Sequence, residues 1–413
     1  DARVYATMDG HRSDDYSVYV YVSEDYGDSW RSIVSNLADG HTMNVIREHP
    51  RNEDLLVLGG ELGAYITINR GEEWHQIKGP VPTVPVDDIA IHPRENDLIL
   101  GTHGRSIWVL DDMTPLEQLS ERVLASDLHL FDVRDAVAYR IFNHKGNTGH
   151  KMFIAPNPPE GALIHYYLND EFNGEDAVEI TIQGEAGETI RTLTGSGSAG
   201  LNRVNWDLRH EPPLAPTGQG GFGGPPPGPR ALPGTYTIRV AAGDSQATKT
   251  ARVAGDPRIN VPAADRRAQR DALLELGGLV ARLDAAHQTA VSLQAELGSL
   301  AESLEDAEVP ESILSLVESV SEQVDDLEGK LARGGGFGSV RPRPLYARMT
   351  RLYGNLNSYT EGPSAFQLER IDLHAQELEG LVEELNRVIA DEIANLNTTM
   401  EQNGIQRIAT QSR

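Results

Sequence analysis

The spacing of apolar residues divides the chain into a β-rich first part and a helical last part. Up to residue 257, apolar positions alternate with polar ones in short runs, as in 18–22 and 64–68. An alternation with period two is typical of a strand that buries one face. From residue 258 onward the spacing becomes three and four, which indicates amphipathic helices. The pattern predicts a multidomain chain, mainly β at first and all-α at the end.

The β-rich part begins with an internal repeat. The sequence around His49-Pro50-Arg51 returns around His92-Pro93-Arg94, an offset of 43 positions (92 minus 49). Repeats of this length are typical of four-stranded propeller blades, so we expect a partial β-propeller over residues 1–125, in which the two histidines mark turns. Two or three blades cannot close a ring. We therefore expect a missing N-terminal portion, a partner that covers the open edges, or a small open stack of sheets.

A second motif recurs inside the same repeat, on the hairpin turn that follows each alternating strand. Its members are Ser23, Asp25, Gly27 and Trp30 in the first copy and Thr67, Asn69, Gly71 and Trp74 in the second. The Asp or Asn side chain can accept backbone N–H bonds, the glycine supplies a positive φ, and the tryptophan fills space between strands. We interpret all eight residues as structural and not as catalytic.

This motif resembles the Asp-box, or BNR repeat, S-x-D-x-G-x-[ST]-W, of sialidases and of VPS10/sortilin-type propellers. The first copy matches in full, whereas the second has Thr67, Asn69 and Glu73 at variant positions. The resemblance covers about the first quarter of the chain and implies propeller blades. A sialidase also needs a tyrosine nucleophile and an arginine triad gathered around the whole ring, and these cannot be assigned in two or three blades.

The middle of the chain predicts a linker and then a small sandwich. Residues 126–157 form the linker, with short strands near 128–131 and 137–139, and residues 158–257 form the sandwich, interrupted by a Gly/Pro-rich loop at 212–233. Its strands are expected at 163–168, 178–182, 189–193, 204–208 and 236–240. Residues 201–209, with Pro233-Gly234-Thr235-Tyr236, are similar to FlgD-like immunoglobulin-type modules that follow such propellers in bacterial secreted proteins.

Residues 258–413 predict four helices that fold into an antiparallel bundle or a coiled-coil hairpin. Ser364 and Gln367 have the spacing of a capping box for the last helix. The apolar seam of the first helix is formed by Leu276, Leu279, Leu283, Ala286, Ala290, Leu293, Leu297, Leu300 and Leu304.

Composition narrows the possible partners. The chain has 36 Lys and Arg against 62 Asp and Glu, a formal net charge of -26, which excludes nucleic acid and anionic lipid as expected partners. There is no cysteine, so disulfides and thiolate metal sites are excluded. No apolar run approaches the ~20 residues of a transmembrane helix, so we expect membrane association only through partner proteins. We predict no cofactor and no metal.

Two further groups are candidates for a contact site. His103, Arg105, Asp111 and Asp112 follow one another in a single stretch that could bind a metal or an anion, although hydrogen-bonded structure is the favoured interpretation. Phe222 and Phe337 lie among glycines and are candidates for a protein contact, although a mobile loop is the favoured interpretation.

These observations favour a bacterial, extracytoplasmic (periplasmic or secreted) scaffold that binds proteins in a larger assembly and is not an enzyme. A specific version is an accessory periplasmic subunit of a respiratory or photosynthetic membrane complex. The alternative is the C-terminal part of a secreted glycan-binding or sialidase-type propeller protein.

Overall fold

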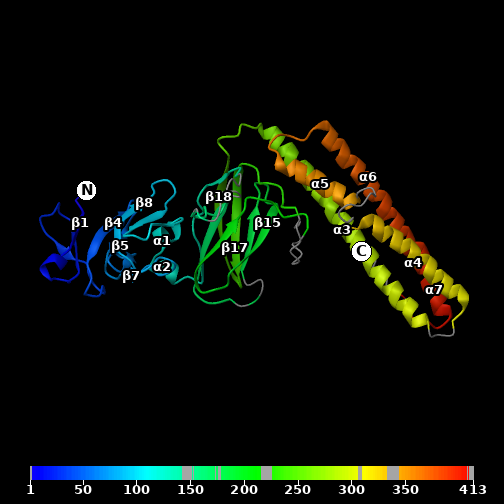
Figure 1. Ribbon diagram of the computed structural model, residues 1–413, viewed down its shortest axis with the longest axis horizontal. Coiled ribbons are helices and arrows are strands. Elements are labelled where there is room, and N and C mark those ends of the chain that lie inside the picture. Colours follow the sequence, from blue (N-terminus) through cyan, green and yellow to red (C-terminus); the bar gives the residue numbers. More distant parts are fainter. Residues whose placement is uncertain are drawn as a thin grey trace. The chain divides into compact units, whose positions relative to one another are not determined.

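The computed structural model describes residues 2–141, 151, 153–172, 174, 178–214, 226–305, 309–332, 344–406 and 408. Its contacts group into two compact units. The first comprises Asp1–Asp207 with Pro233–Ala254, and the second comprises Leu208–Leu232 with Gly255–Arg413. The first unit is mainly β and the second carries the long helices, as Figure 1 shows. The predicted order, β structure followed by a helical region, is confirmed.

The first unit opens with three small antiparallel sheets. Sheet one is β1 (Val4–Met8), β2 (Tyr19–Ser23) and β3 (Arg31–Ser32), with a short 3-10 turn at His11–Ser13. Sheet two is β4 (Met43–His49), β5 (Asn52–Gly60), β6 (Gly63–Thr67) and β7 (His75–Gln76). Sheet three is β8 (Val86–Ile91), β9 (Leu98–Thr102) and β10 (Ile107–Leu110). Two short helices follow, α1 (Thr114–Gln118) and α2 (Glu121–Leu124).

Strand register shows that sheets one and two repeat the same arrangement. Val4 lies opposite Ser23 in sheet one, and Leu56 lies opposite Thr67 in sheet two. A hydrogen bond from Tyr26 N to Ala2 O also returns as one from Arg70 N to Asp54 O. Strands β1 and β2 of sheet one therefore correspond to β5 and β6 of sheet two, and the counterpart of β4 is not among the strands of sheet one.

Alternation along β5 buries sheet two on both faces. Leu56 and Leu58 pack with Val20 and Val22 of sheet one, and all four are at most 3% exposed. The alternate residues Leu55 and Val57 pack instead with Val86, Ile89, Leu98 and Leu100 of sheet three. Successive side chains of a strand point to opposite faces, so one apolar run closes two interfaces at once.

The rest of the first unit is a pair of sheets. One contains β11 (Leu128–Leu130), β13 (Ala162–Leu168) and β16 (Gly200–Trp206). The other contains β12 (Ala136–Ala138), β18 (Ser245–Gly255), β17 (Gly234–Ala242), β14 (Val178–Gln183) and β15 (Thr189–Gly195), in that spatial order. Trp206 of the first sheet meets Tyr236 of the second edge to face, with ring centroids 5.0 Å apart. This aromatic contact lies between the two sheets, and both rings are buried.

Two features of this pair of sheets differ from the sequence analysis. The short strands β11 and β12, which were placed in a linker, pair with β13 and β18 and so complete the two sheets. Strand β18 was not predicted, because polar residues such as Lys249 and Thr250 dominate it and its buried positions are limited to Ala251 and Val253 near its end.

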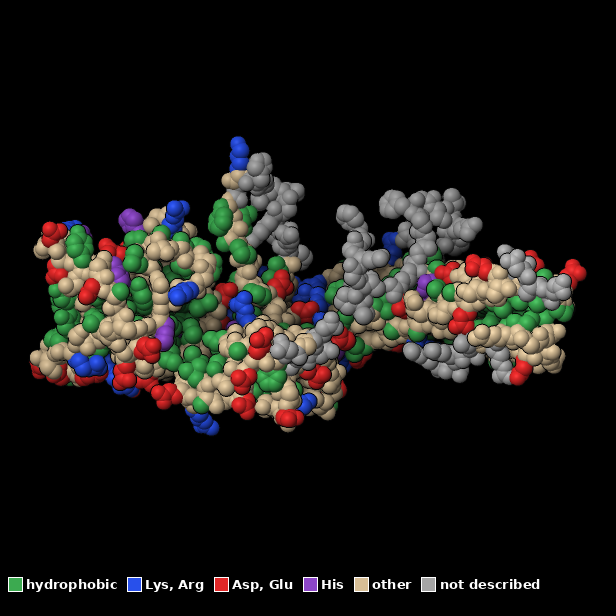
Figure 2. Space-filling view, turned by 90° about the horizontal axis from the view of Figure 1, so that it is seen from below, with side chains coloured by type: hydrophobic (Ala, Val, Ile, Leu, Met, Phe, Trp, Pro, Cys, Tyr) green, Lys and Arg blue, Asp and Glu red, His purple; other side chains and the backbone are tan. Residues whose placement is uncertain are grey.

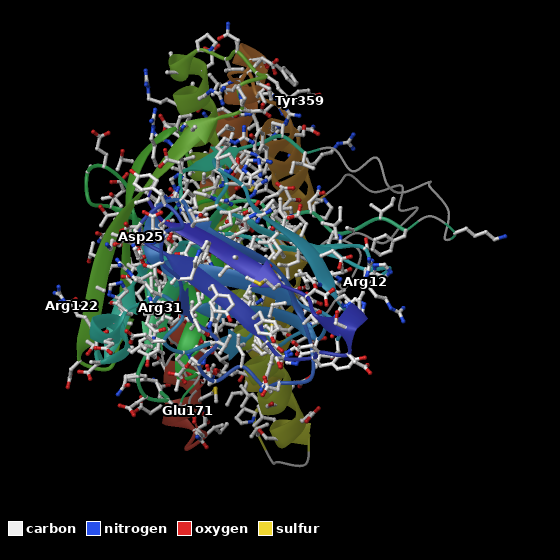
Figure 3. All side chains as sticks on the ribbon, turned by 90° about the vertical axis from the view of Figure 1, so that its left-hand side faces the viewer. Arg12, Asp25, Arg31, Arg122, Glu171 and Tyr359 are labelled. Carbon is white, nitrogen blue, oxygen red and sulfur yellow. The ribbon has the colours of Figure 1, made fainter. Side chains whose placement is uncertain are left out.

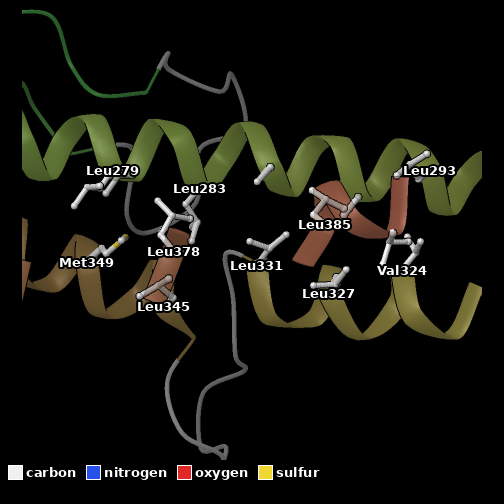
Figure 4. Packing of buried hydrophobic residues seen from close by; sticks show 14 of the residues in the cluster. Leu279, Leu283, Leu293, Val324, Leu327, Leu331, Leu345, Met349, Leu378 and Leu385 are labelled. Atoms are coloured by element: carbon white, nitrogen blue, oxygen red, sulfur yellow. The ribbon is translucent and has the colours of Figure 1, made fainter. Parts of the chain in front are cut away.

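The second unit is helical. Its helices are α3 (Ala263–Glu305), α4 (Glu311–Leu331), α5 (Leu345–Ser358), α6 (Ala365–Arg387) and α7 (Ala394–Gln402), with a π-helical stretch at Val388–Ile393 between the last two. Every one of these helices contributes to a single apolar cluster, part of which Figure 4 shows. Leu283 and Leu297 of the predicted seam are fully buried. The capping box at Ser364 and Gln367 is also confirmed.

One segment from the Gly/Pro-rich stretch packs against this helical region. The Tyr353 hydroxyl donates to the Pro227 carbonyl at 3.0 Å, and Asn357 Nδ2 donates to the same oxygen at 3.1 Å. Arg209 Nη1 donates to the Gly228 carbonyl at 2.8 Å. The first two bonds attach residue 227 to α5, and the third ties residue 228 to Arg209. Among the described helices, none carries an apolar stretch long enough to cross a bilayer.

Candidate interaction surface

The hairpin turn of sheet one is held by the residues of the recurring motif. Ser23 Oγ donates to Asp25 Oδ1 at 2.8 Å and accepts the Gly27 N–H at the same distance. Asp25 in turn accepts the backbone N–H of Ser29 at 2.8 Å and its hydroxyl at 2.6 Å. These donors lower the pKa of Asp25 to about 2, with the Ser29 hydroxyl as the largest cause. Gly27 has a φ of 99°, which favours glycine.

The turn of sheet two repeats this network with substituted side chains. Thr67 Oγ1 donates to Asn69 Oδ1 at 2.7 Å and accepts the Gly71 N–H at 3.1 Å. The Glu73 N–H reaches Asn69 Oδ1 at 3.0 Å. An amide oxygen accepts the same backbone bonds as a carboxylate oxygen, so the turn tolerates Asn where the first copy has Asp.

Trp74 connects sheet two to the sheet before it. It is 3% exposed, and its indole N–H donates at 2.8 Å to the carbonyl of Ile33, the residue that follows β3 of sheet one. Asn36 completes the junction, because its side chain accepts from Trp74 N at 2.8 Å and donates to Trp74 O at 2.9 Å. The tryptophan of the motif therefore closes the interface with a preceding sheet.

The corresponding side chains of sheet one are exposed to solvent. We call the side of a sheet that is turned toward the preceding sheet its upstream face; in sheet two it contains Leu56, Leu58, Tyr65 and Trp74. By register, the upstream face of sheet one contains Val4, Ala6, Tyr21 and Trp30. Val4 is 40% exposed and Trp30 45% exposed, against 0% for Leu56 and 3% for Trp74. The indole N–H of Trp30 turns back to the Gly27 carbonyl at 3.0 Å.

Sheet three is open on its opposite side. We call the side turned toward a following sheet the downstream face; in sheet two it includes Ala64 and Ile66, which pack on sheet three. The counterparts in sheet three are Ile107 and Val109, because Ile107 pairs with Gly101 as Ala64 pairs with Gly59. Ile107 is 67% exposed and Val109 52% exposed, whereas Ala64 is 1% exposed. Both ends of the three-sheet stack thus present apolar side chains to solvent.

Charged side chains accompany the contacts between sheets. Arg3 of sheet one binds Glu48 of sheet two at 3.1 Å and Glu53 at 2.9 Å, in addition to Glu24 of its own sheet. The Tyr5 hydroxyl also donates to Glu48, and burial followed by this hydrogen bond raises the tyrosine pKa. Figure 2 shows acidic side chains spread over the sheets with apolar ones between them. Because the carboxylate partners are partly exposed, ion pairs of this kind contribute little to stability.

Figure 3 shows sheet one from its outer side. Asp25 and Arg31 lie at one end of the sheet, where the motif turn is, and Arg12 lies at the other end. The open upstream face lies between these two ends.

The four residues from His103 to Asp112 do not converge. His103 and Arg105 are exposed in the turn between β9 and β10, where His103 Nδ1 lies 3.2 Å from Asp87 Oδ2. Asp111 and Asp112 follow the far end of β10, so the length of that strand separates the two pairs. Asp111 is half-buried, and burial followed by the nearby Asp97 raises its pKa.

Asp112 lies at the junction with the pair of sheets. It is 4% exposed, and its Oδ1 accepts from Thr114 N at 3.1 Å. Its Oδ2 lies 3.8 Å from Nδ1 of the buried His165, and neither of these two atoms has a hydrogen-bond partner in the described structure. Burial lowers the His165 pKa, Asp112 opposes that shift, and Arg203 and Arg134 reinforce it. Such a buried pair is a polar contact within the first unit.

The other residues singled out from sequence include two phenylalanines and two turn histidines. Phe222 and Phe337 lie outside the described residues. Across the described ranges, no three His, Asp or Glu side chains gather in a way that could hold a metal ion. His49 and His92 both accept the N–H of the residue two positions on, at 3.3 Å, as expected of turn residues. The exposed Val4, Ile107 and Val109 were not singled out from sequence, although the offset of 43 between repeats relates Ile107 to Ala64 and Val109 to Ile66.

The three sheets and their open faces define a propeller-like region followed by a two-sheet region and helices. Residues 18–121 match the model of the Sortilin-Vps10 family, described as "Sortilin, neurotensin receptor 3". No curated protein matches the chain.

Two solved structures align weakly. An ancestral GH74 enzyme aligns at 12% identity and a TM-score of 0.20, over 61% of this chain and 34% of the other. A mutant of Salmonella alpha-2-macroglobulin aligns at 15% identity and a TM-score of 0.17, over 57% and 13%. The chain therefore covers about a third or less of either structure.

Proposed function

We propose that this chain is a non-enzymatic, extracytoplasmic subunit that binds other proteins through the open faces of its three-sheet stack. The observation that carries the proposal is the contrast within one repeat. Trp74 and Leu56 are buried in sheet two, whereas their counterparts Trp30 and Val4 are exposed in sheet one. Apolar surface that is buried wherever a neighbouring sheet is present is suited to a protein partner, and tryptophan is a frequent anchor of such interfaces.

The finer assignments belong to the same proposal. The three sheets are blades of an Asp-box propeller, the pair of sheets is an FlgD-like immunoglobulin-type module, and the helices form an antiparallel bundle. The match of residues 18–121 to the Sortilin-Vps10 family supports the propeller and an extracytoplasmic location. The net charge of -26 supports protein partners over nucleic acid. A bacterial accessory subunit on the periplasmic side of a membrane complex is the specific form we propose.

The test compares recovery of partners by three tagged proteins from an extracytoplasmic extract of the native source. The proteins are the unmodified chain, a Val4→Asp/Val109→Asp variant, and a Leu274→Asp control, which changes a 43% exposed residue on α3. We expect stoichiometric partners with the unmodified chain and the control, and at least a tenfold loss with the double variant. A glycan array is measured in parallel. Glycan binding or hydrolysis without a protein partner would replace this proposal with the glycan-active propeller.

A further inference from the structure

The helical unit buries one histidine among the apolar side chains of its core. His374 of α6 is 2% exposed and lies on the buried face of that helix, between Ile371 and Leu378. Its Nδ1 atom is buried and has no hydrogen-bond partner in the part of the chain that the structure describes. A histidine at such a position suits its apolar surroundings only while the ring is neutral, because a buried charge without a partner is costly.

Two cations and one carboxylate act on the His374 ring. Burial is the largest cause that lowers the His374 pKa, and Arg348 of α5 and Arg370 of α6 lower it further, whereas Glu377 opposes the shift. The Glu377 carboxylate already accepts from both terminal nitrogens of Arg348, at 2.8 and 2.5 Å. A proton on His374 therefore places a third cation beside two arginines and a single carboxylate, at the contact between α5 and α6.

The other helices that pack against α6 form their ion pairs further along it. Arg282 of α3 binds Glu379 at 2.7 Å, and Lys330 of α4 lies 3.4 Å from Glu384. Both carboxylates follow His374 in sequence, and each has a cation of its own. Protonation of His374 leaves these two pairs in place, so its effect falls on the contact with α5.

We infer that His374 is an acid-sensitive release for α5: a proton on its ring opens the contact between α5 and α6. Helix α5 has 14 residues, against 43 in α3 and 23 in α6, so it is the one of the three whose separation exposes the least apolar surface. The opening exposes the buried face of α5, of which Figure 4 shows Leu345 and Met349.

Opening also frees the segment that α5 holds. Both donors to the Pro227 carbonyl, the Tyr353 hydroxyl and the Asn357 amide, lie on α5. One proton thus controls the exposure of an apolar helix face and the attachment of residue 227. The inference concerns the helical unit alone and does not depend on the open faces of the three-sheet stack.

The direction of the pH effect follows from the burial of the ring. Burial lowers the His374 pKa in the closed state below its ordinary value of 6.5. Below pH 6.5 the open state therefore binds the proton more readily than the closed state does, and acidification shifts the population toward the open state.

Two buried methionines of the intact chain test this without any substitution. Met349 of α5 and Met400 of α7 are both 0% exposed. We expect hydroxyl-radical oxidation of Met349 to become at least threefold faster between pH 7.5 and 5.5, while that of Met400 stays constant. Equal responses of the two methionines, or no response of Met349, would overturn the inference.

Variants then assign the response to His374. Hydrogen exchange of the α5 amides, corrected for the intrinsic rate at each pH, should also show opening at least threefold more frequent at pH 5.5 than at pH 7.5. His374→Leu, which continues the apolar face of Ile371 and Leu378, should abolish this difference. The matched control is His287→Gln, because His287 of α3 lies 2.8 Å from Glu328 of α4, and this variant should keep the difference. An acid response of α5 that persists in a folded His374→Leu chain would overturn the assignment.

Discussion

The indole N–H of Trp74 donates to the carbonyl of Ile33 at 2.8 Å, across the boundary between two sheets. The indole N–H of Trp30, at the same motif position in sheet one, donates instead to the Gly27 carbonyl of its own turn. The same motif position is therefore buried in sheet two and exposed in sheet one, depending on whether another sheet packs against its upstream face.

Replacing the two tryptophans should therefore have unequal effects on stability. We expect Trp74→Ala to lower the free energy of unfolding of the first unit by about 3–5 kcal/mol, because it leaves a cavity between sheets. Trp30→Ala should cost about 1 kcal/mol, because that side chain is 45% exposed. All four tryptophans of the chain lie in the first unit, so fluorescence in a urea titration reports that unit. Equal losses would contradict the distinction.

Alanine substitutions at the two motif glycines should also cost more stability in sheet two than in sheet one. Gly27 and Gly71 both have positive φ, 99° and 86°, so alanine at either position costs about 1–2 kcal/mol of backbone strain. An added Cβ at Gly71 would also lie 3.0 Å from the Ile33 Cβ, whereas at Gly27 its nearest contact is the Trp30 ring at 3.7 Å. Gly71→Ala should be the more destabilising substitution in the same titration. A larger loss for Gly27→Ala would be at odds with the interface at Ile33.

The first unit should lose stability on mild acidification. Burial lowers the pKa of His165 below its ordinary value of 6.5, and burial also lowers that of His129. Below pH 6.5 the unfolded chain binds these protons more readily than the folded chain does, so the free energy of unfolding falls as the pH drops toward the folded-state values. The groups that face His165 are Asp112, Arg203 and Arg134.

Unfolding titrations from about pH 7.5 to 5.5 test this, over a range in which ordinary carboxylates stay ionised. His165→Gln should give a shallower dependence than the unmodified chain, and adding His129→Gln should flatten it further. An unchanged slope in the double variant would contradict the assignment.

The anchoring of residue 227 to α5 can be tested in the second unit. Tyr353 is fully buried and its hydroxyl donates to the Pro227 carbonyl. Tyr353→Phe should lower the stability of the helical unit by about 0.5–1.5 kcal/mol, the net contribution of one hydrogen bond. Thermal unfolding followed by circular dichroism at helical wavelengths measures it. The Asn357→Ala control removes the second bond to the same carbonyl, and its effect should be smaller because Asn357 is only half-buried whereas Tyr353 is fully buried.

Sequence periodicity predicted the elements whose burial is one-sided and strong. The alternation around Val20 and Val22 is compatible only with a strand, and the heptad-like spacing around Leu283 only with a helix. Both elements lie where the sequence predicted them. Strand β18 was missed because polar residues dominate it and only Ala251 and Val253 near its end are buried, so the alternation carries little hydrophobic contrast.

The open faces were harder to predict, since an exposed Val109 and a buried Leu56 look alike in sequence. Only the register between repeats separates them, by showing that Val109 holds the position of Ile66. The candidate residues between His103 and Asp112 show the opposite difficulty, because closeness in sequence did not mean closeness in space. Strand β10 lies between the His103 and Arg105 pair and the two aspartates.

Hydroxyl-radical footprinting of the intact chain tests the open stack most directly, because the chain offers matched residues of the same type. Trp30 and Met8 are 45% and 53% exposed, while Trp74 and Met43 are 3% and 1% exposed. We predict oxidation of Trp30 and Met8 at least five times faster than that of Trp74 and Met43. Equal protection of Trp30 and Trp74 in the isolated chain would mean that sheet one is already covered, and would contradict the account.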